Sequence, residues 1–307
     1  SSYLWICGET RMSISSFDGL TIGDAVGRGA TSTVYRGVRN GRELAIKKLS
    51  YPSRETRKAF RRELLILNSV NHRNILQLQG SCESPRLLTL FTELCQGGSV
   101  FDILHYSNIE LALSQQCTIL GNVADAMDYL HGLEPMLIHR DLKSPNILLS
   151  RPLRTENDVP RVKICDFGSA QMVKAPKNLS EGNAMTKNVG SPPWTAPEVQ
   201  SGQYDEKVDV YSFAMIMFEL LSYQVPYSDI QDEPIRRLSS QGIRPDLREV
   251  DPDAPPSLIE LMVSCWANDP TDRPDFKSIC RMLLQTSLYR PEEIRRLIES
   301  KGQRVSL

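Results

Sequence analysis

The chain has 307 residues, of which 40% are hydrophobic and 24% charged, and its formal net charge is −1. This composition is typical of a soluble globular protein, and the balanced charge gives no reason to expect a nucleic-acid partner. The seven cysteines show neither a CxxC pair nor the spacing of zinc ligands. Free thiols in a reducing compartment are the simple interpretation, so we expect a cytoplasmic protein.

The longest strongly apolar segment, residues 211–221, is shorter than the roughly 20 residues that a membrane span needs, so we expect none. The first residues lack the basic and apolar regions of a signal peptide. Because the chain does not begin with Met, we expect a part of a longer protein, with possible regulatory domains outside it.

The first third of the chain is predicted to form an antiparallel sheet with one helix. Asn40-Gly41 predicts a hairpin turn. Ser53 predicts the N-cap of a helix whose apolar positions recur from Phe60 to Leu67. Alternation of polar and apolar residues predicts five strands, at residues 20–26, 32–38, 42–49, 76–82 and 87–93.

The pattern becomes mostly helical after the break at Gln96-Gly97-Gly98. Helices are predicted at residues 113–130, 208–221 and 256–266. The expected fold class is therefore α+β, with a small β-rich lobe and a larger helical lobe, and the cleft between them is the default ligand site. The expected parts are an N-terminal extension (1–19), an N-lobe (20–95), a C-lobe (96–284) and a helical tail (285–307).

A glycine-rich segment, GRGATS at residues 27–32, lies between the first two predicted strands. Gly27 and Gly29 would let backbone amides approach phosphate groups, with Val34 following in the next strand. Taken alone, a tight hairpin without a ligand is the better interpretation of such a segment.

The third predicted strand carries Ala45 and Lys47 on one face, while Lys48 points to the other. Glu63 on the following helix is placed to pair with Lys47. The alternative is a solvated carboxylate, because the helix segment RKAFRRE is highly charged. We favour the pair.

Four motifs follow in the second part of the chain: HRDLKSPN at residues 139–146, DFG at 166–168, APE at 196–198 and DPTDRP at 269–274. Together with the glycine loop and Lys47, they resemble the catalytic domain of eukaryotic protein kinases over about residues 20–284. The resemblance implies a bilobal protein-kinase fold. The one departure among the required positions is Ser32, where the third glycine is usual.

The resemblance implies a role for each polar residue of these motifs. Asp141 would be the catalytic base, Lys143 the phosphate contact, and Asn146 and Asp166 the ligands of Mg²⁺. Ser191 matches the position whose hydroxyl bridges the catalytic Asp and Lys.

The same resemblance implies an ATP site, in which Lys47, oriented by Glu63, contacts the phosphates. Thr92 would be the gatekeeper residue before the hinge, with a pocket extending behind it. The residues implied to contact ATP are Gly27, Gly29, Ser32, Val34, Ala45, Lys47, Thr92, Glu93, Cys95, Ser99 and Leu148.

Other positions are expected to be structural or regulatory. His139 would stack with Phe167, Leu67 and Leu78, and Arg140 would bind a phosphorylated activation segment. Two anchors are expected: an ion pair between Glu198 and Arg273, and Asp209 holding the backbone of the catalytic loop. The candidate phosphorylation sites are Ser180, Thr186 and Ser191; residues 150–161 are expected to be a solvated insertion, and Pro291 to begin a tail helix.

Lys143 in DLKSPN follows the serine/threonine pattern, whereas WTAPE at residues 194–198 is similar to tyrosine kinases. This mixture resembles the tyrosine-kinase-like group, which includes the mixed-lineage and Raf-type kinases. We therefore expect an ATP- and Mg²⁺-dependent kinase of Ser and Thr residues in proteins, switched by phosphorylation. A pseudokinase scaffold and a tyrosine or dual-specificity kinase are the alternatives.

Overall fold

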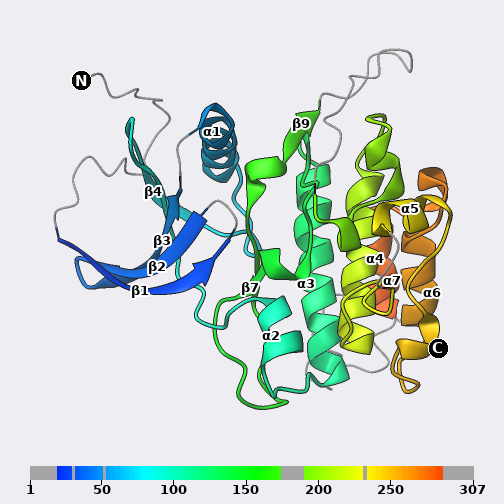
Figure 1. Ribbon diagram of the computed structural model, residues 1–307. Coiled ribbons are helices and arrows are strands. Elements are labelled where there is room, and N and C mark those ends of the chain that lie inside the picture. Colours follow the sequence, from blue (N-terminus) through cyan, green and yellow to red (C-terminus); the bar gives the residue numbers. More distant parts are fainter. Residues whose placement is uncertain (1–18, 30–31, 51–52, 174–189, 231–233, 286–307) are drawn as a thin grey trace. The chain divides into compact units, whose positions relative to one another are not determined.

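The computed structural model describes residues 19–29, 32–50, 53–173, 190–230 and 234–285 (Figure 1). These residues form two compact units. Unit 1 comprises the described residues up to Asn71 together with Leu76–Cys95. Unit 2 comprises His72–Ile75 and the described residues from Gln96 onward.

Unit 1 is a five-stranded antiparallel sheet with one helix, as the sequence predicts. The strand order is β1-β2-β3-β5-β4. The turn between β2 and β3 has positive φ angles of 50° at Asn40 and 76° at Gly41, which Asn and Gly tolerate best. The strands are β1 Leu20–Arg28, β2 Ser32–Arg39, β3 Arg42–Leu49, β4 Leu78–Glu83 and β5 Leu88–Thr92.

The single helix of unit 1, α1, spans Arg54–Ser69. Ser53 is its N-cap, because its side chain accepts a hydrogen bond from the Thr56 amide at 3.1 Å. The buried face of α1 includes Phe60 and Leu67, as predicted, and it also includes the carboxylate residue Glu63. A charged residue on a buried face requires a partner.

Unit 2 is mainly helical, and α4 (Lys207–Ser222) is buried over nearly its whole length. This burial explains why its sequence is apolar all round rather than amphipathic. The other helices are α2 Val100–Tyr106, α3 Leu113–His131, α5 Ile235–Ser240, α6 Pro256–Cys265 and α7 Phe276–Gln285. Two small antiparallel sheets complete the unit: β6 Met136–Ile138 with β9 Gln171–Val173, and β7 Ile147–Leu149 with β8 Val162–Ile164.

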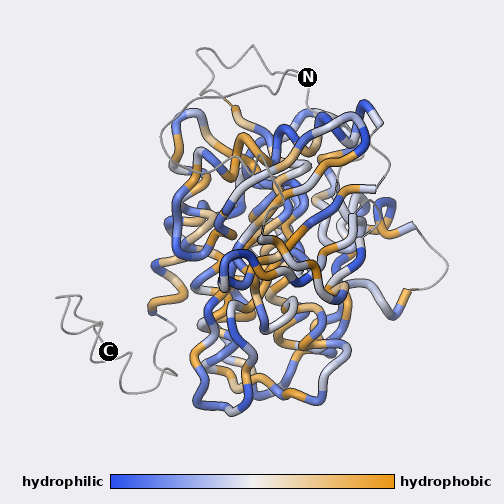
Figure 2. The backbone as a smooth tube through the Cα atoms, turned by 90° about the vertical axis from the view of Figure 1, so that its left-hand side faces the viewer, coloured by the Kyte–Doolittle hydropathy of each residue, from blue (hydrophilic) through white to orange (hydrophobic). Residues whose placement is uncertain are grey.

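The predicted α+β class is confirmed. Hydrophobic and hydrophilic residues alternate over short distances along the backbone (Figure 2), as expected where each element turns one face inward. The predicted strand at residues 76–82 begins two residues late, at Leu78. Ile75, just before it, instead pairs with Ile164 in unit 2. Within the described ranges, no helix is long and apolar enough to cross a membrane. The predicted tail helix lies outside the described residues.

Candidate functional site

In unit 1, Lys47 and Glu63 form the ion pair that the sequence predicts. The Lys47 Nζ atom lies 2.8 Å from Oε1 and 2.9 Å from Oε2 of Glu63. Glu63 is only 4% exposed, so this contact satisfies the charge on the buried face of α1. The bidentate contact fixes the direction of the Lys47 ammonium group.

The sheet places Val34, Ala45 and Lys47 on one face, also as predicted. Val34 pairs with Lys47 across β2 and β3, and Ala45 lies two residues before Lys47 on the same strand. Lys48 points to the opposite face, where its Nζ atom lies 5.0 Å from the centre of the Tyr35 ring.

The glycine-rich turn joins β1 and β2. Across this turn, the Gly29 amide donates a hydrogen bond to the Ser32 carbonyl oxygen at 2.8 Å. A Cβ atom on Gly27 or Gly29 would meet its nearest described neighbour at 3.8 or 3.5 Å, which is ordinary contact. Neither glycine has a positive φ angle. Packing within the described chain therefore does not demand glycine at these two positions.

Two of the residues predicted to contact ATP, Thr92 and Ser99, make hydrogen bonds within the protein. Thr92 is buried, and its hydroxyl donates to the Glu93 carbonyl oxygen at 3.2 Å. Ser99 in unit 2 is the N-cap of α2: its hydroxyl donates to Asp102 at 2.7 Å and accepts the Asp102 amide at 3.0 Å. Leu148 forms a bridge with Ser99 in unit 2. The contact of Ser99 with a ribose stays a prediction.

In unit 2, Asp141, Lys143 and Ser191 form one hydrogen-bonded network. The Lys143 Nζ atom lies 3.0 Å from Asp141 Oδ2 and donates to Ser191 Oγ at 2.6 Å. The Ser191 hydroxyl donates to Asp141 Oδ1 at 3.2 Å. The predicted bridge through Ser191 is confirmed as a contact, and it places a carboxylate and an ammonium group side by side.

Asn146 and Asp166, the predicted metal ligands, lie at the same end of the β7–β8 pair. The Cys165 amide donates to the Asn146 carbonyl oxygen at 3.0 Å, and Asp166 follows with a left-handed φ of 64°. The Asn146 amide group donates to the Asp141 carbonyl oxygen at 2.8 Å, which leaves its Oδ1 atom as an acceptor.

These donors suit a hard divalent cation such as Mg²⁺, which commonly binds one or two carboxylates and completes its shell with water and phosphate oxygens. Among the described residues, no group of three or more His, Cys, Asp or Glu side chains could hold a metal ion. Asn146 and Asp166 supply one amide oxygen and one carboxylate, a donor set that fits a divalent cation whose remaining ligands are water or phosphate oxygens.

Asp209 at the start of α4 holds the catalytic loop by its backbone. Its carboxylate accepts the amides of His139 and Arg140 at 2.8 Å each and a ring nitrogen of His131 at 2.9 Å. Complete burial opposes its ionisation, but the His131 hydrogen bond and the neighbouring donors outweigh burial and lower the pKa of Asp209. These contacts also hold Arg140 at an uncommon positive φ of 65°.

The His139 side chain is structural, as expected. It is fully buried, its Nε2 atom lies 3.1 Å from the Cys165 carbonyl oxygen, and its ring centre lies 5.0 Å from that of Phe167. Leu67 and Leu78, the other expected members of this stack, belong to unit 1.

The Arg140 guanidinium donates to three neutral acceptors. They are the Ser169 carbonyl oxygen at 2.7 Å, the Gln171 side chain at 2.6 Å and the Tyr204 hydroxyl at 3.2 Å. Arg140 is thus held close to β9, which belongs to the activation segment (residues 166–198).

The predicted ion pair between Glu198 and Arg273 is also observed. The Arg273 guanidinium makes a bidentate contact with Glu198, at 2.5 and 3.1 Å. Its remaining donors reach the carbonyl oxygens of Ala267 at 2.9 Å and Lys207 at 3.1 Å. Arg273 is 1% exposed, so this contact compensates a fully buried charge.

The comparisons agree with this geometry. The family model "Protein kinase domain" matches residues 20–284. The chain belongs to the protein kinase family. Membership implies ATP as the phosphoryl donor, a divalent metal ion and a protein acceptor for this kinase domain.

The relatives of this kinase domain support its predicted place in the tyrosine-kinase-like group, which is confirmed. A probable serine/threonine-protein kinase of Dictyostelium discoideum is 35% identical over 87% of this chain and 28% of that protein. Dual specificity protein kinase pyk3 of the same organism is 33% identical over 86% and 18%. Mitogen-activated protein kinase kinase kinase 7 of Bos taurus is 35% identical over 89% and 44%. The chain therefore spans less than half of each relative.

The role of Glu219 in this kinase domain was not predicted from the sequence. Its fully buried carboxylate lies 2.8 Å from a ring nitrogen of His105 in α2 and accepts the Ser144 hydroxyl at 2.6 Å and the Trp194 indole N–H at 2.9 Å. It thus ties α4 to the catalytic loop and to the segment after Ser191. The only sequence signal was one acidic residue inside an apolar helix.

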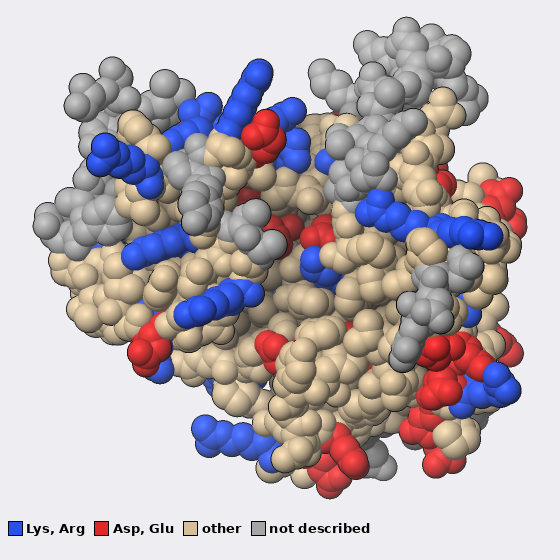
Figure 3. Space-filling view, in the orientation of Figure 1, with Lys and Arg blue, Asp and Glu red and all other residues tan. Residues whose placement is uncertain are grey.

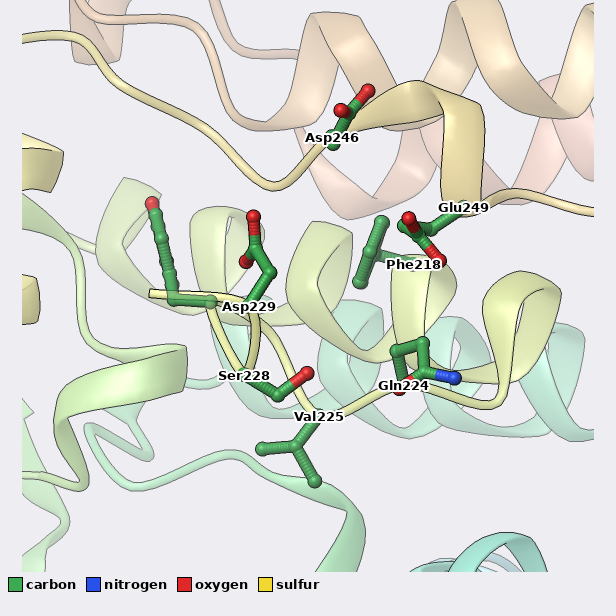
Figure 4. A pocket seen from close by; sticks show the side chains of 8 residues that line it. Phe218, Gln224, Val225, Ser228, Asp229, Asp246 and Glu249 are labelled. Atoms are coloured by element: carbon green, nitrogen blue, oxygen red, sulfur yellow. The ribbon is translucent and has the colours of Figure 1, made fainter. Parts of the chain in front are cut away.

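The side of the kinase domain drawn in Figure 3 carries both basic and acidic side chains, with acidic residues gathered at the lower right. Unit 2 also has a pocket of about 200 Å³, and the residues that line it include Phe218, Asp229, Asp246 and Glu249 (Figure 4). None of the predicted site residues lines this pocket. Arg248 lies against Asp246 at 2.8 Å and lowers its pKa, so part of the negative charge is already compensated.

Proposed function

We propose that this kinase domain is an active enzyme that transfers the γ-phosphate of ATP to Ser or Thr hydroxyls of proteins, with Mg²⁺ as its metal ion. The network of Asp141, Lys143 and Ser191 carries the proposal. It supplies a proton acceptor and a cation at one point, which is what phosphoryl transfer to an alcohol requires.

In this mechanism Asp141 accepts the proton of the acceptor hydroxyl. The oxygen of that hydroxyl bonds to the γ-phosphorus while the bond from phosphorus to the bridging oxygen of ADP breaks. Lys143 stabilises the negative charge of the transferred group. The Ser191 hydroxyl contacts both Asp141 and Lys143 and so fixes the position of these two side chains relative to each other. A Mg²⁺ ion held by Asn146 and Asp166 would neutralise charge on the phosphate oxygens.

The residues of unit 1 bind the phosphates of ATP. Lys47 is oriented for this by Glu63, and the glycines of the turn would let a phosphate approach the backbone closely. Packing against the described residues does not demand glycine at residues 27 and 29, which is consistent with a role in close approach of a phosphate. Val34 and Ala45 share a face with Lys47 and would contact the adenine.

Phosphorylation of the activation segment is the proposed switch. Arg140 donates to neutral acceptors, and a phosphate would offer stronger, charge-assisted hydrogen bonds. Ser180 and Thr186 are the candidate activating sites; both lie outside the described residues. Ser191 is engaged with Asp141 and Lys143, so its phosphorylation would break the catalytic network.

Two alternatives have some support. Dual specificity is favoured by the tyrosine-kinase-like segment around Trp194 and by one relative, which is named a dual specificity protein kinase. A pseudokinase scaffold is favoured only by Ser32 in place of the third glycine.

One experiment separates these functions. Wild type, Asp141→Asn and the exposed control Asp253→Asn are assayed with Mg-ATP for autophosphorylation, followed by phosphoamino-acid analysis and a thermal shift with Mg-ATP. We expect phosphoserine or phosphothreonine from the wild type and the control, and none from Asp141→Asn. Equal signal from all three would refute the proposed base. Phosphotyrosine would indicate dual specificity, and no thermal stabilisation by Mg-ATP would indicate the scaffold.

A further inference from the structure

The segment between β7 and β8, residues 150–161, is folded against the rest of unit 2 rather than simply solvated. We call it the β7–β8 loop. Its ends are joined by a hydrogen bond from the Ser150 amide to the Arg161 carbonyl oxygen at 2.9 Å. Leu153 and Pro160 are buried, although most of the loop is exposed. The expectation of a solvated insertion is therefore only partly correct.

Asp158 organises the interior of the loop. Its Oδ2 atom accepts the amides of Arg154 at 2.6 Å and Thr155 at 2.9 Å. The Asp158 amide donates to the Thr155 carbonyl oxygen at 3.1 Å. This turn leaves the carbonyl oxygens of Thr155 and Asp158 pointing at one donor outside the loop.

That donor is Gln115, in the first turn of α3. Its Nε2 atom donates to the carbonyl oxygens of Thr155 at 3.0 Å and Asp158 at 2.9 Å. Its Oε1 atom accepts the Ala112 amide at 3.1 Å. Gln115 is 3% exposed, so a buried amide with all of these contacts made holds the β7–β8 loop to α3.

The start of the loop in turn holds the segment Gln96–Gly98. The Gln96 amide donates to the Ser150 carbonyl oxygen at 3.2 Å, and the Gly97 amide donates to the Leu149 carbonyl oxygen at 2.9 Å. A Cβ atom on Gly97 would lie 2.4 Å from the Arg151 carbonyl oxygen, so only glycine allows this approach.

This segment leads directly into the predicted ATP contacts of unit 2. Leu149 donates its amide to the Gly98 carbonyl oxygen at 2.9 Å, and the neighbouring residues Ser99 and Leu148 form a bridge. The chain of contacts therefore runs from Gln115 through the β7–β8 loop to Ser99 and Leu148. The catalytic loop is anchored separately, by Asp209.

We propose that Gln115 and Asp158 are positioning residues for nucleotide binding, acting through the β7–β8 loop on the segment Gln96–Gly98 and on Leu148. The inference rests on the proposed ATP-dependent function. Because Asp209 anchors the catalytic loop independently, releasing the β7–β8 loop weakens ATP binding and leaves the rate of the chemical step nearly unchanged.

The test variant is Gln115→Glu at pH 8, which keeps an acceptor for the Ala112 amide but removes the donor to the loop. Gln116→Glu is the matched control, because the Gln116 amide is also buried but donates to the Leu111 carbonyl oxygen at 3.3 Å. Asp158→Ala is a second variant, at a loop position accessible enough for the domain to fold.

We measure the Kd of Mg-ATP by calorimetry, kcat and KM, and amide hydrogen exchange of residues 96–99 and 150–161. We expect Gln115→Glu to raise Kd and KM for ATP at least about fivefold, because it removes two hydrogen bonds to the loop and places a carboxylate against the Thr155 and Asp158 carbonyl oxygens, with kcat within about twofold. Asp158→Ala should also raise Kd and KM for ATP. In both loop variants, amide exchange should accelerate at residues 96–99 and 150–161. In Gln116→Glu, exchange in these two ranges should stay as in the wild type.

Two other outcomes are distinct. If the wild type binds ATP and both loop variants bind it equally well, the positioning role is wrong, even if exchange accelerates at residues 150–161. If the wild type does not bind ATP, the proposed function itself fails, and the positioning role fails with it.

Discussion

Replacement of Arg273 by Leu tests whether the Glu198–Arg273 anchor stabilises unit 2. The substitution removes the bidentate contact with Glu198 and leaves the carbonyl oxygens of Ala267 and Lys207 without this donor. The Glu198 side chain is only 16% exposed, so water only partly replaces the lost cation.

The expected loss follows from this burial. Removing one partner of a buried ion pair typically costs about 3–5 kcal/mol, because it leaves the other charge uncompensated. For a domain of 150–250 residues, each kcal/mol lowers the melting temperature by about 2–4 °C. Arg273→Leu is therefore expected to lower the melting temperature by roughly 6–20 °C.

The assay is thermal and urea unfolding of wild type, Arg273→Leu, Glu198→Leu and the double variant. We expect the double variant to be less destabilised than the sum of the single variants, because neither charge is then left alone. Arg248→Leu is the control, since the ion pair of Arg248 with Asp246 is exposed and should contribute little. A loss below about 1 kcal/mol in Arg273→Leu, or additive single effects, would refute the reasoning.

Three further predictions concern the site and its surroundings. Glu63→Gln should lower kcat/KM for ATP by about 10- to 100-fold, because Lys47 loses a charge-assisted partner; unchanged steady-state kinetics would contradict this. The pKa of Asp209 is lowered in the folded state, so its ionised form contributes stability above the unfolded value of about 3.9 and loses it as pH falls through the folded value. The stability difference between wild type and Asp209→Asn in urea should thus shrink as pH falls below about 4; a difference that shrinks already between pH 8 and 5 would be inconsistent with it. Burial raises the pKa of the Cys265 thiol to about 12, so iodoacetamide at pH 8 should modify Cys265 only after unfolding, as mass spectrometry can show; rapid modification of the folded protein would count against this burial.

Much of the fold was predictable because local patterns decide it. The turn at Asn40-Gly41 and the cap at Ser53 depend on the conformational preferences of the residues themselves. The contact of Lys47 with Glu63 was predictable because the motifs give their spacing. The predicted strand at residues 76–82 started two residues too early, and the bridge of Ile75 with Ile164, 89 positions further along the chain, could not be predicted from local pattern.

Ser99 shows where a motif-based role needed the structure. Its position predicts a ribose contact, whereas its hydroxyl caps α2 together with Asp102. A serine before a helical segment indicates both roles equally well, since the same oxygen can accept a backbone amide or face a ligand. The hydrogen-bond geometry shows the cap, and the ribose contact stays a prediction.

The sequence by itself determined the chemistry that is proposed for this kinase domain: a carboxylate in Asp141, an ammonium group in Lys143, and side-chain oxygens in Asn146 and Asp166. The tertiary structure decided which distant groups hold them. Glu219 lies 114 residues from His105, and Gln115 lies 43 residues from Asp158. Glu219 and Gln115 are both buried, and each is hydrogen-bonded to its distant partner. No local pattern specifies such partners, because the need to satisfy a buried polar group arises only when the elements pack.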